Sequence, residues 1–488
     1  MKSLLKRYLK MAMVLLPLAG MGGCNWLDVT PDAEVSIDRM FSKPEGFQNA
    51  LLGVYTSMTH QSEKEARMYG QDMTYGFMDV LAQYYTVVDN KAHEYYYVSR
   101  MEYNNAQALD RVKAMWLGCY NSIANCNVLL DELSRKDAGF FEGHEYRLIK
   151  GEAYALRAYL HFDLFRMFAL AWEKAKSSLT IPYVNDFSKQ IHQQCTGEEV
   201  IRMALADLDS AANLLNGIDP VLESGYQLMR NHFDDPQIPD HVFLSYRGFR
   251  LNYYAVKALM ARIHFYTGNQ TAAFQYAEEV IAAKEAGFFQ FTTQADFEKS
   301  EKDRDLQMYN ELIFALDDAT VTKRWFGVSK SDNTAFKVAK AAAIYSSGDF
   351  RLNLLKVDKS ASLKYEDLEG AKNKKIPLLR LSEMYLIAAE AGYGINKSVA
   401  ISRIEELKDN RGCSLNMDDY SFEALQQEVL AEARREFLGE GQLFYWYKRL
   451  QCPEILRGDQ KVQMKPDHYI LPLPATEVEF GDRFQPKA

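Results

Sequence analysis

Cysteine is scarce in this sequence, which argues against a disulfide framework and against a zinc site. The 488 residues include only six cysteines, so five remain besides Cys24. Cys119 and Cys126 lie seven residues apart in a predicted helix, about 10 Å along its axis and too far to bridge. We interpret them as small core residues. The sequence leaves a Cys413–Cys452 bridge open, and no cysteine spacing is typical of zinc ligands.

Recognisable catalytic motifs are also missing. The sequence has no GxSxG, no GxxxxGK[ST], no GxGxxG and no HExxH pattern. The nine histidines are scattered and never fall four residues apart. Acidic pairs such as Asp317-Asp318 are common, and a glycosidase requires two carboxylates facing each other across a cleft, an arrangement that the sequence leaves open. We therefore predict a protein that is not an enzyme and has neither a cofactor nor a metal site.

Charge and hydropathy exclude two further classes of protein. The formal net charge is −9, and the first ten residues contain four bases and no acid, so the rest is more acidic still. An acidic chain repels nucleic acid and anionic lipid, so we predict no nucleic-acid partner. The longest apolar run, residues 11–21, would rise about 16 Å as a helix, roughly half of a bilayer core. A membrane-spanning helix is therefore not expected.

The N-terminus instead has the pattern of an export signal that ends at Cys24. Four bases precede the apolar run, and Gly22 and Gly23 supply the small residues of a cleavage site. A cysteine directly after these residues suggests a lipoprotein, cleaved before Cys24 and acylated on it. An ordinary secretory signal, with Cys24 incidental, is the alternative. We predict a signal peptide over residues 1–23 and an extended tether over residues 24–43.

Most of the remaining chain shows the periodicity of amphipathic helices. A first helix is predicted over residues 46–58, and further helices over 116–130, 143–168, 198–215, 422–439 and 442–450. Two helix pairs, 253–266 with 271–283 and 381–393 with 397–407, are joined by short turns with small residues on both sides. This is the tetratricopeptide pattern, in degenerate and widely spaced copies. The fold class is thus mainly α, a helical-repeat body.

Two segments interrupt the helical pattern. Residues 60–110 are rich in tyrosine and weakly periodic, and residues 286–376 mix apolar clusters with Asp, Ser and Lys. We predict loops with short helices in the first segment and loops with a few short strands in the second. The strip Tyr469–Pro474 contains two prolines and is expected to pack in an extended conformation. Charged clusters, such as the one around Arg434 to Glu440, are interpreted as ion-pair networks between helices.

Seven segments of the sequence, taken in order, match the pattern of one known family. They are Cys24–Pro31, Phe47–Tyr55, Trp116–Asn127, Glu152–Tyr159, Pro377–Ala391, Arg434–Gly441 and Leu471–Val478. Together they resemble the SusD/RagB family of Bacteroidetes outer-membrane nutrient-binding lipoproteins. The resemblance covers nearly the whole chain, so that residues 44–488 would form one SusD-like domain with inserted loops at about 60–110 and 286–376. Two segments depart from the family pattern: Ala169–Trp172, where a Gly-rich turn is common, and Gln442–Arg449.

The resemblance implies a function as well as a fold. Such proteins have four tetratricopeptide-like units and an irregular, loop-rich face that binds ligand. They sit on the cell surface, anchored by lipid in the outer membrane, and cap a SusC-like TonB-dependent transporter like a lid. They capture oligosaccharides, or peptides in some branches. A secreted tetratricopeptide adaptor that binds a protein or peptide partner is the alternative reading of the helical repeats.

Aromatic residues make up 13% of the chain, and some of them are expected to form the ligand site. A flat ring can stack on the C–H face of a sugar, and nearby polar groups can fix its hydroxyls. We place the site on the loops 67–105 and 320–350, since binding residues concentrate on loops held by a rigid scaffold. Core packing is the competing role for each candidate. The candidates are Trp325, Tyr75, Tyr84, Tyr96 and Tyr345, with Asp72 and Arg351 as polar partners.

Overall fold

The computed structural model describes residues 37–59, 68–188, 190–222, 242–244, 246–300, 303–329, 336–368 and 374–486. The predicted signal peptide, Cys24 and the first part of the tether lie outside these ranges. Residues up to Gly46 form one unit and Phe47–Ala488 the other. Helix α2 (Ile37–Met40) lies within the predicted tether, which is therefore not extended there. No helix of the described ranges is long and apolar enough to cross a membrane.

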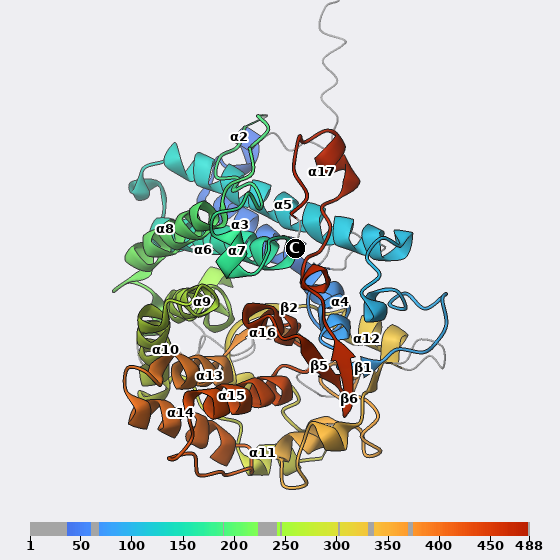
Figure 1. The fold of residues 1–488 in the computed structure, drawn as a ribbon. Helices are drawn as coiled ribbons and strands as arrows, with labels where there is room; N and C mark the ends of the chain where they lie inside the picture. Colours follow the sequence, from blue (N-terminus) through green and yellow to red (C-terminus); the bar gives the residue numbers. More distant parts are fainter. Residues whose placement is uncertain are drawn as a thin grey trace, which may run out of the picture. The chain divides into compact units, whose positions relative to one another are not determined.

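The amino-terminal helices confirm the periodicity of the sequence. They are α3 (Pro44–Thr59), α5 (Ala106–Ser134), α6 (Glu145–Phe168) and α8 (Gly197–Leu215). Helix α6 packs against both α5 and α8 and is buried along nearly all of its length (Figure 1). Helix α8 begins with a capping box in which the Thr196 hydroxyl accepts from the backbone of Glu199 and the Glu199 carboxylate accepts from that of Thr196.

The carboxy-terminal helices form the predicted pairs. Helices α9 (Tyr253–Tyr266), α10 (Gln270–Glu285), α13 (Leu381–Gly392) and α14 (Lys397–Asp409) pack on one another in this order (Figure 1). Small residues allow the close approach, because a Cβ on Gly392 would lie 2.6 Å from the Phe274 ring. Helices α15 (Phe422–Glu436) and α16 (Leu443–Leu450) follow, also as predicted.

Strands and short helices occur in the two irregular segments and also outside them. Strand β1 (Tyr85–Thr86) pairs antiparallel with β3 (Lys337–Val338), and this pairing brings the two predicted loop regions together. Strand β2 (Leu312–Asp317) pairs with β4 (Lys375–Arg380), with Leu312 opposite Arg380. The hairpin of β5 (Glu454–Arg457) and β6 (Gln460–Gln463) was not predicted. Short helices are η1 (Met68–Asp72), α4 (Phe77–Leu81), η2 (Val98–Arg100), α7 (Trp172–Ala175), η7 (Arg247–Phe249), α11 (Gln294–Glu298), η8 (Tyr309–Glu311), α12 (Val321–Ser329), η10 (Phe350–Leu354), η11 (Pro466–Tyr469) and α17 (Ala475–Glu479).

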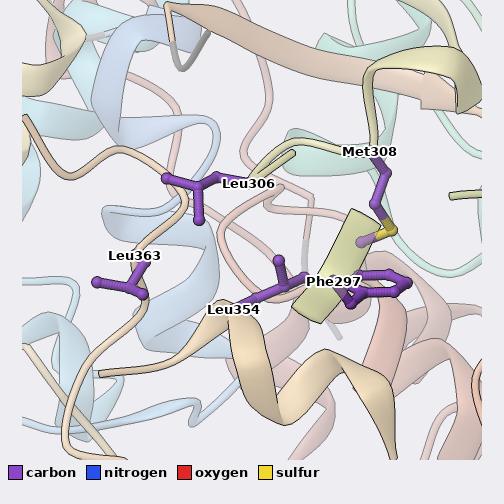
Figure 2. Packing of buried hydrophobic residues seen from close by; sticks show 5 residues of the cluster. All are labelled: Phe297, Leu306, Met308, Leu354 and Leu363. Carbon is purple, nitrogen blue, oxygen red and sulfur yellow. The ribbon is translucent and has the colours of Figure 1, made fainter. Parts of the chain in front are cut away.

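A small hydrophobic cluster anchors the second irregular segment from within. Five buried side chains from separate turns of this segment converge there (Figure 2). The burial of apolar surface contributes about 25 cal/mol per Å² to stability. This contribution stabilises a segment that has little regular hydrogen bonding of its own. The five residues are Phe297, Leu306, Met308, Leu354 and Leu363.

A buried ion-pair network ties the irregular segment to the helical body. The Glu436 carboxylate of α15 accepts from Arg351 Nη1 at 2.6 Å and from Arg411 Nε at 2.6 Å, and Arg380 Nη2 lies 2.9 Å away. A second carboxylate, Glu311, accepts from Arg411 at 2.6 Å. The side chains of all five residues are at most 1% exposed. The predicted role of the charged clusters is thereby confirmed for Glu436.

We expect Glu436→Gln to destabilise the fold strongly. The substitution leaves the Arg351, Arg380 and Arg411 guanidinium groups buried with one fewer counter-charge, a change that costs about 3–5 kcal/mol. The matched control is Glu285→Gln, because Glu285 is a 58% exposed partner of Arg403 and such pairs contribute less than about 1 kcal/mol. Chemical denaturation of both variants compares the two losses, and equal losses would contradict the structural role of Glu436.

The five cysteines that the structure describes are free thiols, which settles the pairing that the sequence left open. Cys119 and Cys126 are buried in α5, as predicted, and neither forms a bridge. Cys413 and Cys452 are also free thiols, so that bridge is not formed. Burial raises the pKa of the Cys413 and Cys452 thiols to about 11 each, so both stay protonated and weakly reactive at neutral pH.

His161 on α6 is held in its neutral form by two backbone groups. Its Nδ1 lies 2.9 Å from the Arg157 carbonyl oxygen, to which it must donate, and its Nε2 accepts from the Val184 amide at 2.9 Å. The ring also stacks on Tyr183, with centroids 3.8 Å apart. Protonation would place an N–H of the ring against the N–H of Val184. Burial lowers the pKa of His161 to about 3.

This arrangement predicts a loss of stability in acid. Between about pH 6.5 and pH 3 the unfolded chain takes up a proton at His161 that the folded chain excludes, so the free energy of unfolding falls as the pH falls. We expect the His161 ring to show no titration in NMR spectra between pH 8 and pH 4. A midpoint near pH 6.5 in the folded protein would contradict the proposed hydrogen bonding.

Candidate glycan-binding cleft

A cleft of about 1030 Å³ lies where the segment before α5 meets the carboxy-terminal tail. One wall is formed by Tyr97 and residues 101–105, and the other by η11 and the residues that follow it. Such a volume is at the upper end of the range typical of ligand sites. The lining residues are Tyr97, Met101, Glu102, Tyr103, Asn104, Asn105, Lys465, Pro466, Asp467, His468, Ile470, Pro472, Gln485 and Pro486.

Hydrogen bonds fix the two walls relative to each other. The Tyr103 hydroxyl donates to the His468 carbonyl oxygen at 2.6 Å and so joins one wall to the other. The tail is attached to the helical body, because the Leu471 amide donates to the Met167 carbonyl oxygen at the end of α6. Residues 470–474 are not helical, as predicted, but Tyr469, the first residue of the predicted strip, is the last residue of the short helix η11. The two walls of the cleft are therefore held in place by hydrogen bonds to each other and to α6.

The cleft combines an aromatic ring with several polar side chains. Tyr97 is partly exposed, and Tyr96 lies perpendicular to it with ring centroids 5.0 Å apart. Arg100 covers the Tyr96 ring at 3.7 Å and pairs with Asp89 at 2.8 Å. Exposed Glu102 and Asn104 line the same wall as Tyr97, and exposed Asp467 lies on the other wall. A ring edged by amide and carboxylate groups suits a ligand with both C–H faces and hydroxyls.

The charged groups of the cleft are exposed or neutral. Partial burial lowers the pKa of His468, so its ring is uncharged at neutral pH. Its Nδ1 accepts from the Lys465 amide at 3.3 Å, which leaves Nε2 to donate a hydrogen bond. Within the described residues, no group of three His, Cys, Asp or Glu side chains is arranged to hold a metal ion.

The aromatic candidates of the sequence analysis are mainly core residues. Trp325 is 1% exposed and Tyr75 is fully buried. Their rings meet edge to face with centroids 5.2 Å apart, and Tyr75 also contacts Tyr365. Trp325 lies on the unexpected helix α12, which turns it inward while its neighbour Phe326 is 53% exposed. The two loops named for the site meet in the β1–β3 pair, but these two rings pack on each other.

The other buried candidates serve internal hydrogen bonds. Tyr84 and Tyr345 donate to the carbonyl oxygens of Arg434 and Arg435, at 2.7 and 3.1 Å. Tyr84 and Tyr345 thus have the competing role, because they pack inside the protein and hold loop segments to α15.

The two polar candidates are internal ion-pair residues. Arg111 lies 2.8 Å from Asp72, which also accepts from the Tyr95 hydroxyl at 2.6 Å. Arg351 pairs with Asp349, Glu432 and Glu436. None of these side chains has surface to offer a ligand in this conformation.

Tyr96 alone of the seven candidates is partly exposed, and its role as a ligand residue stays a prediction. It lies beside the cleft and contacts Tyr97, which sequence reasoning passed over. The second wall, residues 465–486, was also missed. A signal was present, because the proline-containing strip was predicted to pack on the body, but its partner could not be named from the sequence.

Two family models match the chain. One, described as starch-binding and associating with the outer membrane, matches residues 25–221, and the other, the SusD family, matches residues 260–478. The chain belongs to the SusD/RagB family. The expected resemblance and the mainly helical, tetratricopeptide-like fold are therefore confirmed. None of the curated proteins compared with the chain matches it.

Solved structures share this SusD fold at low sequence identity. A SusD superfamily protein from Bacteroides thetaiotaomicron is 20% identical, with a TM-score of 0.71 over 91% of this chain and 100% of its own. A SusD-like carbohydrate binding protein from Bacteroides vulgatus is 17% identical, with a TM-score of 0.70 over 91% and 98%. The surface glycan-binding protein A from Bacteroides fluxus is 17% identical, with a TM-score of 0.65 over 91% and 98%.

The different surroundings of Trp325 and Tyr97 predict different effects of truncation. Trp325→Ala leaves a cavity among Tyr75, Tyr365 and Phe336 and should lower the stability by about 3–5 kcal/mol. Tyr97→Ala removes a partly exposed ring at the cleft and should change it by less than about 1 kcal/mol. Denaturant unfolding followed by Trp fluorescence measures both. A stable Trp325→Ala variant would contradict the core role.

Proposed function

We propose that this protein is a cell-surface lipoprotein that captures oligosaccharides in the cleft between Tyr97 and Asp467. It passes the captured glycan to a SusC-like TonB-dependent transporter in the outer membrane and acts as the lid of that transporter. The protein binds and releases its ligand without turnover. The lipid on Cys24 holds it at the membrane.

The observation that carries this proposal is the combination of family and cleft chemistry. Members of the same fold are named as carbohydrate- or glycan-binding proteins. The cleft offers a partly exposed tyrosine ring, with exposed Asn104, Glu102 and Asp467 around it. Sugars expose both apolar faces and hydroxyls, so this pairing of surfaces matches them.

Moderate affinity is the expected consequence of this design. A ring contact with its polar partners contributes on the order of 1–2 kcal/mol net, so a few such contacts give millimolar to micromolar binding. A protein that delivers its cargo to a transporter must release it. When the lid closes, the binding protein and the transporter contact the same glycan. The second contact then forms at a high effective concentration, so the glycan is held more tightly than by either protein alone.

We expect one class of oligosaccharide to bind the soluble form, residues 25–488, in isothermal titration calorimetry against panels of glycans and peptides. Tyr97→Ala should weaken this binding about tenfold, because the stacking ring is lost. Asn104→Ala should weaken it less. Phe422→Ala, which truncates a 37% exposed ring of α15 outside the cleft, is the matched control and should leave it unchanged.

Three results would contradict the proposal in different ways. Glycan binding that survives Tyr97→Ala would keep the function but remove the cleft as its site. If only peptides bind, the ligand class is peptides and not oligosaccharides. Release of shortened sugars during the titration, detected by chromatography, would make Glu102 and Asp467 candidates for catalysis.

A further inference from the structure

A second pocket of about 360 Å³ lies apart from the cleft and shares none of its lining residues. It is bounded by α3, by the segment around η7, and by the end of the β2–β4 pair where Asp317 faces Lys375. Its volume suits a ligand of one or two rings. The lining residues are Leu52, Tyr55, Thr56, Tyr246, Phe249, Arg250, Ala315, Leu316, Asp317 and Lys375.

Arg250 is the unusual member of this lining. It is only 6% exposed, yet none of its three guanidinium nitrogens has a hydrogen-bond partner among the described residues. Its nearest opposite charge is Glu152 Oε1, 3.3 Å from Nη2, and the Phe243 ring lies 4.6 Å from its guanidinium carbon. A buried guanidinium with five unused donors is costly to maintain.

The neighbouring Arg247 shows what a structural arginine looks like here. Its Nε and Nη2 donate to both oxygens of Asp219, at 2.8 and 2.6 Å, and its Nη1 donates to Glu152. The other oxygen of Glu152 accepts from the Tyr55 hydroxyl at 2.5 Å. Burial lowers the pKa of Arg250, and the charge of Glu152 offsets this only in part. The local carboxylates are therefore committed to Arg247 and Tyr55.

A second cation and several apolar surfaces complete the pocket. Lys375 Nζ lies 4.7 and 4.8 Å from the ring centres of Tyr246 and Phe249 and donates to Asp317 at 2.6 Å. The Asp317 side chain is 62% exposed, so this pair is held at the rim. Asp317 is the one acid among the lining residues, against two cations.

We propose that this pocket binds a carboxylate-bearing ring ligand, such as an acidic sugar. The carboxylate pairs with Arg250, and the ring lies against Tyr246 and Leu52. Because the guanidinium nitrogens are shielded from solvent, binding includes a rotation of the Arg250 side chain into the pocket. An arginine fork matches a carboxylate in shape and charge, and it would gain the hydrogen bonds that the fold does not provide.

Calorimetry of the soluble form with sodium glucuronate, sodium benzoate and glucose tests this proposal. At least one of the two acids should bind, and glucose should bind at least tenfold more weakly at this pocket. Arg250→Met, which keeps most of the side-chain volume, should weaken acid binding about tenfold or more, since it removes a charge-assisted pair. Lys375→Gln should weaken it severalfold. Tyr97→Ala in the cleft should leave acid binding unchanged.

The melting temperature gives a second readout that separates a binding role from a structural one. Since Arg250 makes no hydrogen bond to any described residue, Arg250→Met should melt at the same temperature as the parent protein or at a higher one. A fall of more than about 5 °C would show that Arg250 stabilises the fold and would overturn the proposal. Absence of acid binding, or acid binding that persists in both Arg250→Met and Lys375→Gln, would overturn it as well.

Discussion

The buried charge network centred on Glu436 is the constraint on which much of this structure depends. Glu436 belongs to a helix near the end of the chain, whereas its partners come from η10, from the end of β4 and from the turn after α14. Buried charges are tolerated only when they are paired and hydrogen-bonded. Segments without regular secondary structure are thereby held at fixed positions on the helical body.

The same constraint decides which residues are left for ligand binding. Tyr84 and Tyr345 belong to the two irregular segments, but their hydroxyls donate to backbone oxygens of α15 next to the network. Arg351 is one of its three central cations. A side chain that holds a loop in place is not free to bind a ligand as well. The candidate ligand-binding surfaces therefore lie elsewhere, in the cleft near Tyr97 and in the pocket near Arg250.

Two arginines on loops illustrate how little the residue type alone says about its role. Arg351 and Arg250 are both nearly fully buried. Arg351 donates to three carboxylates, while Arg250 donates to none within the part of the chain that the structure describes. The burial of Arg351 is explained by its ion pairs within the fold. The burial of Arg250 has no such explanation, and the proposed ligand pocket is based on this difference. Relatives that are 17–20% identical share the fold, so the scaffold tolerates wide variation on its faces.

The sequence by itself determined the helical body. The periodicity of 143–168 and of the pairs 253–266 with 271–283 and 381–393 with 397–407 predicted helices close to the observed bounds, because amphipathic spacing and local caps such as Asn269 and Asn396 act over a few residues. The hairpin β5–β6 also had a local signal, Gly458-Asp459 with Gly458 at φ +62°, that was not used.

Only the tertiary structure decided which aromatic and charged residues face the solvent. Trp325 lies in a stretch without helical periodicity, yet packing against Tyr75 and Tyr365 places it in a helix with its ring inward. Tyr96 and Tyr97 are adjacent in sequence, and only the position of residues 465–486 makes Tyr97 part of a cleft. Such exposure depends on contacts between residues hundreds of positions apart, which no local pattern encodes.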